Sequence, residues 1–392
     1  MWVAGEEGVA SMRYVDVCGE GVSALGMGMM RLPVVNGDAG HIDQEATNAA
    51  VDAALAAGIN YFDTAWGYHK GTSEVAAGVA LGRHERDEYF LATKFPSYDS
   101  ANFGKHEEIF AKQLQKCQVQ RFDFYLLHNV NEGNIDFYLS DAGQRTIEYL
   151  LGRKAAGQIG HLGFSTHSTL DTFTRFLQRH GQHMEFCQLE VNYLDWEFQD
   201  AKSKVALCAQ CGIPVWVMEP LRGGYLCKLS QQQLAPLAAL RPQASAHEWA
   251  FRWLAEKLPN SVILSGMGSA QMVQDNARIF SEGAPLAAEE LAAVDALAAQ
   301  MAATIGLPCT ACRYCTEYCP QGLDIPELLA LYNEARSRGD EVGFIAPMRI
   351  AALASERRPS ACIGCGACKR VCPQGLAIPE ALAELAQMAE KS

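Results

Sequence analysis

Four titratable residues in the N-terminal part of the chain follow or lie near the ends of short apolar runs: Asp63, Tyr68, Lys94 and His128. Each has an ordinary structural explanation when it is taken alone. Asp63 could cap a helix, Lys94 could be a solvated strand end, and His128 could be a hydrogen-bonded histidine of the core. Together, at consecutive strand ends that face one mouth, a carboxylate, a phenol, an ammonium and an imidazole are suited to acid–base chemistry.

Eight of the 14 cysteines form two runs of identical spacing near the C-terminus. The runs are Cys309-x2-Cys312-x2-Cys315-x3-Cys319-Pro320 and Cys362-x2-Cys365-x2-Cys368-x3-Cys372-Pro373. This spacing wraps three thiolates around one 4Fe–4S cluster, and in two-cluster proteins the fourth cysteine ligates the other cluster. We therefore assign Cys309, Cys312, Cys315 and Cys372 to one cluster. Cys362, Cys365, Cys368 and Cys319 are assigned to the second cluster.

Structural zinc is the alternative for these cysteines, since zinc sites also use pairs of cysteines two residues apart. Zinc would not require a third such step followed by Cys-Pro, twice in one chain. The spacing therefore favours two 4Fe–4S clusters.

The elements that must position these residues are predicted from apolar periodicity. Strand-like apolar runs lie at Ser23–Met29, Gly58–Asp63, Tyr89–Lys94, Phe122–His128, Ile159–Ser165, Phe186–Asn192, Ile213–Met218 and Ser261–Ser265. Helical patterns between them include Gln44–Ala57, Thr169–His180, Gln199–Cys211 and Ala246–Leu258. Strands that alternate with helices predict an α/β fold with a parallel sheet. Eight such units favour a closed (β/α)8 TIM barrel, whose chemistry lies at the C-terminal ends of the strands. A doubly wound open sheet is the alternative.

The chain divides into four predicted parts. Residues 1–11 are a short extension, 12–284 the barrel, 285–305 a connecting helix, and 306–392 a small, mostly α-helical iron–sulfur domain. The last part contains an internal repeat of 53 residues, the separation of Cys319 and Cys372. A helix is predicted after each Cys-Pro, at Ile325–Arg338 and Ile378–Glu390.

Composition excludes several classes of protein. The net charge is −13, which argues against nucleic acid or an anionic membrane as the main partner. No apolar run reaches the roughly 20 residues of a membrane span. The first residues lack the basic-then-apolar pattern of a signal peptide, so we expect a cytoplasmic protein.

The first 300 residues or so resemble the aldo-keto reductase family. Phe62-Asp63-Thr64-Ala65-Trp66-Gly67-Tyr68, followed by Gly71-Thr72-Ser73-Glu74, matches a signature of that family, and Ala92-Thr93-Lys94 and Leu127-His128 complete its tetrad. The resemblance implies interconversion of a small carbonyl and an alcohol. Tyr68 would be the general acid in reduction and the base in oxidation. Lys94, held by Asp63, would lower the pKa of Tyr68, and His128 would orient the substrate oxygen.

The resemblance also implies a nicotinamide cofactor, NADP or NAD. The matching positions are Ser165, Gln188, Met218, Pro220, Leu221, Gly223, Gly266, Gly268, Ser269 and Asn276. Met218 stands where the family usually has an aromatic residue, and Ser265–Ser269 lacks the cation that many NADP-preferring members use. Arg222 and Arg278 are candidate substitutes for that cation, and a flavin in the same pocket is an alternative.

The C-terminal region resembles a two-cluster ferredoxin of the α-helical type. The clusters could exchange electrons with a redox partner protein or a second cofactor. Alternatively, they are structural or sensory beside an independent reductase, or the whole chain is an electron-transfer module.

The expected substrate-pocket residues are Gly26–Arg31, Trp66, Tyr98, Phe103, Asn129, Asn192, Tyr193 and Trp196.

Overall fold

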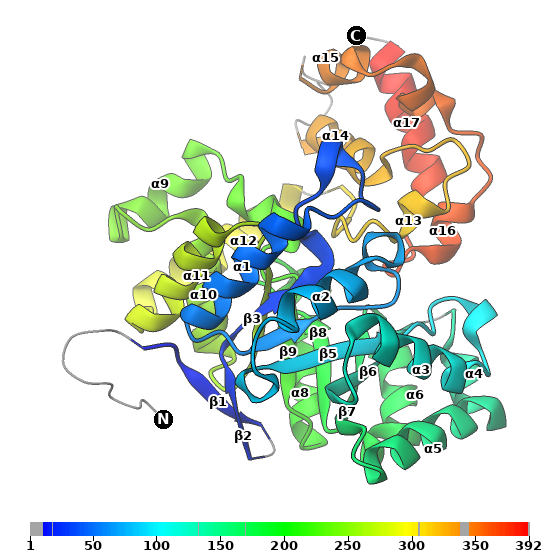
Figure 1. Ribbon diagram of the computed structural model, residues 1–392. Coiled ribbons are helices and arrows are strands. Elements are labelled where there is room, and N and C mark those ends of the chain that lie inside the picture. Colours follow the sequence, from blue (N-terminus) through cyan, green and yellow to red (C-terminus); the bar gives the residue numbers. More distant parts are fainter. Residues whose placement is uncertain are drawn as a thin grey trace.

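Eight parallel strands close into a barrel in the order β10-β3-β4-β5-β6-β7-β8-β9 (Figure 1). The computed structural model describes residues 11–390 except 18, 132, 169, 305 and 338–344. The barrel strands are β3 (Leu25–Gly28), β4 (Tyr61–Asp63), β5 (Phe90–Phe95), β6 (Phe122–Val130), β7 (Ile159–Thr166), β8 (Phe186–Glu190), β9 (Val215–Met218) and β10 (Ile263–Gly266). All eight predicted strands are confirmed, and the sheet is closed rather than open and doubly wound.

Helices follow the strands around the outside of the barrel (Figure 1). They are α1 (Gln44–Ala56), α2 (Ser73–Leu81), α3 (His106–Cys117), α4 (Ile135–Leu139), α5 (Asp141–Ala155), α6 (Leu170–His180), α7 (Asp195–Phe198), α8 (Ala201–Gln210), α9 (Gln231–Leu240), α10 (Ala246–Lys257) and α11 (Ala270–Glu282). The four helices predicted from periodicity are among them. Thr169, the first residue of one predicted helix, lies outside the described residues.

Large aromatic side chains fill the inside of the barrel. The ring of Trp216 on β9 lies 4.1 Å from that of Phe186, 4.7 Å from Phe124 and 4.9 Å from Tyr61, measured between centroids. All four side chains are fully buried. The barrel is therefore a packed core, and its polar side chains are left for the mouth.

A short antiparallel hairpin, β1 (Tyr14–Val17) and β2 (Glu20–Ser23), precedes the barrel. The Tyr14 hydroxyl donates to the Gly58 carbonyl at 2.9 Å, and Ser23 N–H donates to Asn60 Oδ1 at 2.8 Å. Gly58 and Asn60 come just before β4, so the hairpin lies at the N-terminal end of the strands. The hairpin was not predicted from the sequence, and most of the predicted extension, residues 1–10, lies outside the described residues.

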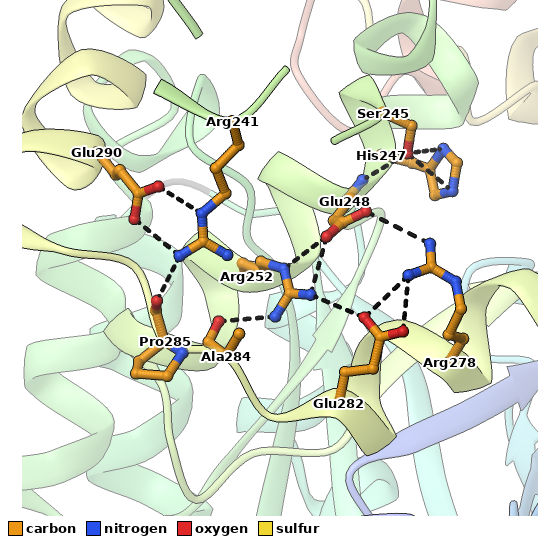
Figure 2. Close-up of polar contacts among 10 residues, drawn as sticks. All are labelled: Arg241, Ser245, His247, Glu248, Arg252, Arg278, Glu282, Ala284, Pro285 and Glu290. Carbon is orange, nitrogen blue, oxygen red and sulfur yellow. Dashed lines mark hydrogen bonds and ion pairs between the residues drawn. The ribbon is translucent and has the colours of Figure 1, made fainter. Parts of the chain in front are cut away.

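A network of ion pairs binds the last helices to the barrel (Figure 2). Arg252 on α10 donates from Nε to Glu248 Oε1 at 2.9 Å and contacts Glu282 of α11 at 3.4 Å. Arg241 Nη2 donates to Glu290 Oε2 at 2.8 Å. Glu290 belongs to α12 (Ala288–Thr304), the helix that leads away from the barrel. The predicted connecting helix is thus present, and its last predicted residue, 305, is not described.

The C-terminal helices form a second, smaller unit over one end of the barrel (Figure 1). They are α13 (Tyr314–Glu317), α14 (Ile325–Ser337), α15 (Ile345–Ala352), α16 (Ala367–Val371) and α17 (Ile378–Glu390). This unit has a core of its own, separate from the barrel core. Residues at equivalent positions of the repeat, such as Ile325 and Ile378 or Leu329 and Leu382, all belong to this core. The last residue of the predicted helix Ile325–Arg338 lies outside the described residues.

Candidate active site and cluster cavities

The structure brings the four predicted catalytic residues together at the C-terminal mouth of the barrel. Asp63, Lys94 and His128 lie on the neighbouring strands β4, β5 and β6, and Tyr68 begins the short helix after β4. Lys94 Nζ donates to Asp63 Oδ1 at 2.5 Å and lies 3.4 Å from the Tyr68 hydroxyl. The rings of Tyr68 and His128 meet edge to face at 5.8 Å.

A bulge in β6 helps to position His128. The register between β6 and β7 shifts between Leu127 and Val130, and Asn129 has a positive φ of 57°. The Asn129 N–H donates to the Ser165 hydroxyl on β7 at 2.9 Å, which secures the bulge. Bulges re-aim side chains beside active sites, and this one directs His128 into the mouth.

The protonation states at the mouth differ from the sequence-based expectation. Burial raises the pKa of Tyr68 well above 10.0, and the Asp63 carboxylate raises this pKa further. The expected lowering by Lys94 is not found, because its ammonium is bound to Asp63 and, at 2.8 Å, to the Thr64 carbonyl. Burial, with the charge of Lys94, lowers the pKa of His128 well below 6.5. Tyr68 therefore carries its proton and His128 is neutral at physiological pH.

A cavity of about 750 Å³ opens above the tetrad, between the barrel and the C-terminal unit. The barrel contributes Tyr68 and His128 to its lining, and the C-terminal unit contributes Cys312, Tyr314 and Cys372. Two predicted cluster ligands thus line the same cavity as two predicted catalytic residues. The sequence placed the two sets in separate domains and did not predict this juxtaposition.

The predicted substrate-pocket residues divide into two groups. Tyr98, Phe103 and Asn129 line the cavity, and so does Met30, whereas the other residues of Gly26–Arg31 do not. Trp66, Asn192, Tyr193 and Trp196 do not line it. The Lys116 ammonium lies 4.4 Å from the centre of the Trp66 ring, and Trp196 packs on Trp253. The Asn192 amide donates to Asp195, and Tyr193 is buried.

Tyr314, which the sequence analysis did not single out, reaches from the first cysteine run into the barrel mouth. Its hydroxyl lies 3.2 Å from His128 Nε2. Its ring stacks on that of Tyr98, with centroids 6.1 Å apart and planes at 29°. No local pattern could reveal this residue, because its role arises only when the two domains are packed together.

The residues expected to bind nicotinamide follow the barrel mouth from β7 to α11, and none lines the large cavity. Ser165, Gln188 and Met218 lie on β7, β8 and β9, Pro220, Leu221 and Gly223 on the loop after β9, and Gly266, Gly268, Ser269 and Asn276 at the end of β10 and on α11. The Oε1 atom of Gln188 is buried without a hydrogen-bond partner among the described residues, so it is an acceptor that a carboxamide could satisfy. Ser269 caps α11 through Met272 N–H.

A cation stands beside the glycines of this segment. A Cβ atom on Gly223 would lie 3.4 Å from Arg31 Nη2, and one on Gly268 would lie 3.2 Å from the Arg31 carbonyl. The same Cβ on Gly223 would lie 3.1 Å from the Thr310 carbonyl, so the C-terminal unit also borders this loop. Arg31 is exposed and has no salt-bridge partner among the described residues.

The two arginines named from the sequence as phosphate ligands are engaged elsewhere. Arg222 is buried, and its Nε donates to Asp195 Oδ2 at 3.0 Å. Arg278 is directed at Glu282 and Glu248, as Figure 2 shows. Arg31 instead borders Gly223 and Gly268.

The eight cysteines of the two runs surround two small cavities. Cys309, Cys312, Cys315 and Cys372 line one of them. Cys319, Cys362, Cys365 and Cys368 line the other. Each cavity thus combines three cysteines of one run with the last cysteine of the other. Among the described residues, no three His, Cys, Asp or Glu side chains converge as ligands of a single metal ion.

Left-handed backbone at equivalent positions shapes the two cysteine runs. Gly364 and Gly366 have φ of 68° and 70° in the second run. The equivalent residues of the first run are Ala311 and Arg313, with φ of 53° and 69°. These values cost a residue with a Cβ about 1–2 kcal/mol, so the first run is the more strained.

Comparison with known proteins agrees with this architecture. Residues 24–299 match the model of the aldo/keto reductase family, and residues 308–377 match that of a 4Fe-4S dicluster domain. The chain belongs to the aldo/keto reductase family. It is therefore an oxidoreductase of the aldo-keto reductase type with a 4Fe–4S domain at its C-terminal end.

The relatives align with the barrel. L-galactose dehydrogenase of Arabidopsis thaliana is 27% identical over 298 residues, covering 69% of this chain and 88% of the relative. The NADH-specific methylglyoxal reductase of Escherichia coli is 27% identical over 226 residues, covering 52% and 65%. The structure of a Klebsiella pneumoniae aldo-keto reductase in complex with NADPH has a TM-score of 0.59 at 22% identity, covering 74% and 95%, and supports the fold.

Among the helices that the structure describes, none combines the length and apolarity needed to cross a bilayer.

Proposed function

We propose that the chain interconverts a small carbonyl and an alcohol, with Tyr68 as the proton donor and acceptor. The observation that carries this proposal is the position of the buried Lys94 ammonium, 2.5 Å from Asp63 Oδ1 and 3.4 Å from the hydroxyl of Tyr68, a residue that lines the cavity. A buried ion pair that touches a phenol at the barrel mouth has a high desolvation cost, which a purely structural role would not require.

The protonation states suit reduction. Tyr68 retains its proton because burial raises its pKa, so the phenol can donate to a carbonyl oxygen as negative charge develops there. Neutral His128 offers a hydrogen bond to the same oxygen and fixes its position. The Lys94 ammonium, held by Asp63, lies 3.4 Å from the phenol oxygen on which negative charge develops as the proton leaves.

A nicotinamide nucleotide, NADP or NAD, fits the segment from β7 to α11, and it would supply or accept a hydride at the substrate carbon. Gln188 would bind the carboxamide, since its buried Oε1 has no hydrogen-bond partner in the described part of the chain. Arg31 would meet phosphate beside Gly223 and Gly268. The related reductases named for NADH and NADPH support this assignment.

Two 4Fe–4S clusters are proposed for the C-terminal unit, where they would carry single electrons. Cys309, Cys312, Cys315 and Cys372 would hold the cluster beside the barrel. Cys362, Cys365, Cys368 and Cys319 would hold the outer cluster. The match to a dicluster domain and the two four-cysteine cavities support this assignment over zinc.

We further propose that the clusters serve the barrel, by exchange with a redox partner protein in the cytoplasm or with a second cofactor such as a flavin. The presence of Cys312 and Cys372 in the wall of the tetrad cavity favours this function. The alternative is that the clusters are structural or sensory beside an independent reductase.

Anaerobic purification followed by metal, sulfide and cofactor extraction tests the assignment of groups. We expect about eight iron and eight acid-labile sulfide per chain, and extraction identifies any NADP, NAD or flavin. Stoichiometric zinc without sulfide would contradict the cluster assignment. A deletion of residues 306–392 that leaves turnover unchanged would favour the independent reductase.

A further inference from the structure

We propose that Tyr314, a residue of the iron–sulfur domain, is a positioning residue of the barrel active site, where its hydroxyl holds the imidazole of His128. The inference rests on the proposed function only in assigning His128 to the reaction site. It makes the C-terminal unit a part of the active site as well as an electron carrier.

The contact is specific in geometry. The Tyr314 hydroxyl lies 3.2 Å from His128 Nε2, within hydrogen-bond distance. The Tyr314 ring is held by its stacking on Tyr98, whose own ring meets His128 edge to face at 5.1 Å. His167 approaches the other side of Tyr314, with centroids 6.3 Å apart.

The contact is also the principal polar restraint on the histidine. His128 Nδ1 is buried and has no hydrogen-bond partner among the residues that the structure describes. Among the described residues, the Tyr314 hydroxyl is therefore the hydrogen-bond partner of the ring. A neutral imidazole carries one hydrogen, on Nδ1 or Nε2, and a phenol can donate or accept at its oxygen. The contact at Nε2 therefore restrains both the tautomer and the orientation of the His128 ring.

The position of Tyr314 in the chain links this restraint to the cluster cavity. Tyr314 lies between Cys312 and Cys315, and both cysteines line that cavity together with Cys372 of the second run. Any change in how these cysteines are held must move the backbone that carries the phenol. The orientation of His128 is thereby coupled to the assembly of the C-terminal unit.

The variant Tyr314→Phe tests the inference, because it keeps the ring that stacks on Tyr98 and removes only the hydroxyl. The matched control is Tyr332→Phe, which removes a hydroxyl bonded to Glu384 at 2.7 Å within the same unit, away from the barrel. The first readout is the nitrogen NMR signal of His128 in anaerobically prepared protein labelled at histidine, assigned with His128→Gln.

We expect Tyr314→Phe to shift the nitrogen signals of His128 and to lower kcat for methylglyoxal about fivefold, with KM changed less than twofold. Tyr332→Phe should leave both unchanged. If the His128 signal is the same in Tyr314→Phe as in the unaltered chain, the inference is wrong, whatever the kinetics. If the signal shifts but Tyr68→Phe turns over normally, the positioning contact stands and the proposed function fails.

A second measurement applies if Tyr314→Phe lowers the iron content. His128→Gln lies in the barrel and leaves both cysteine runs intact, so it probes the same contact from the other side. We expect His128→Gln to shift the ring signals of Tyr314. Unchanged Tyr314 signals would overturn the inference.

Discussion

The hydroxyl of Tyr314 and the Nε2 atom of His128 lie 3.2 Å apart, although 186 positions separate the two residues in the chain. One belongs to a cysteine run and the other to a barrel strand. The mouth of the barrel, where the fold carries its chemistry, is therefore built by both domains. The pairing explains why a cavity at this mouth has Cys312 and Cys372 in its wall.

The pH dependence of turnover follows from the pKa shifts of Tyr68 and His128. Reduction requires the protonated phenol, whose pKa lies well above 10.0, and His128 stays neutral because its pKa lies well below 6.5. We expect kcat/KM for reduction to be flat from about pH 6.5 to 9, since neither group titrates there. Oxidation requires the phenolate and should rise about tenfold per pH unit in that range. A bell-shaped reduction profile with an inflection near 7 would contradict these protonation states.

Arg31 is expected to contribute to nucleotide binding. A hydrogen bond to a charged group contributes about 1.5–3 kcal/mol, so Arg31→Ala should weaken NADPH or NADH binding about 10- to 100-fold in a fluorescence titration. The control is Arg278→Ala, whose guanidinium is paired with Glu282 and Glu248 (Figure 2). Equal affinities for the two variants would show that phosphate does not lie beside Gly223 and Gly268.

The crossed cysteine assignment can be tested in a variant in which Cys362, Cys365 and Cys368 are replaced with alanine. This variant should hold only the cluster beside the barrel. Adding Cys372→Ala should reduce the iron content well below about four per chain, because Cys372 lines the cavity of that cluster. Cys319 lines the cavity of the outer cluster, so adding Cys319→Ala should leave about four iron per chain. The opposite result would mean that each run holds its own cluster.

The left-handed residues of the first cysteine run predict a difference in stability. Arg313 has φ of 69° where the second run has Gly366, and its ion pair with Asp324 is half-exposed. Arg313→Gly should therefore stabilise the unit by about 1 kcal/mol, while Gly366→Arg should destabilise it by a similar amount. Anaerobic thermal denaturation followed by cluster absorbance measures both changes. A lower melting temperature for Arg313→Gly would refute the strain argument.

The sequence predicted the barrel well because its signals are local. Each strand is a short apolar run, and Asp63, Lys94 and His128 lie at or near strand ends where parallel topology brings them together. The crossed sets of cysteines were likewise predicted, from spacing within the two runs. The hairpin β1–β2 was missed because each of its strands has only four residues, too few to establish a period.

The remaining differences arise from contacts between distant segments. Tyr314 and Arg31 acquire their neighbours only when the domains and loops pack, so periodicity cannot reveal them. Arg222 looked like a phosphate ligand from its glycine-rich context, yet burial beside Asp195 engages it in an ion pair. Trp196 looked like a pocket residue and instead packs against Trp253.

The most direct test of the central claim, that Tyr68 transfers the proton, is the kcat of Tyr68→Phe with methylglyoxal and a reduced nicotinamide nucleotide under anaerobic conditions. A positioned general acid contributes about 100- to 10,000-fold, so we expect a loss of at least 100-fold with nucleotide affinity unchanged. Tyr149→Phe, on the outer helix α5, serves as the control and should retain full activity. Turnover by Tyr68→Phe within about tenfold of the unaltered chain would contradict the account.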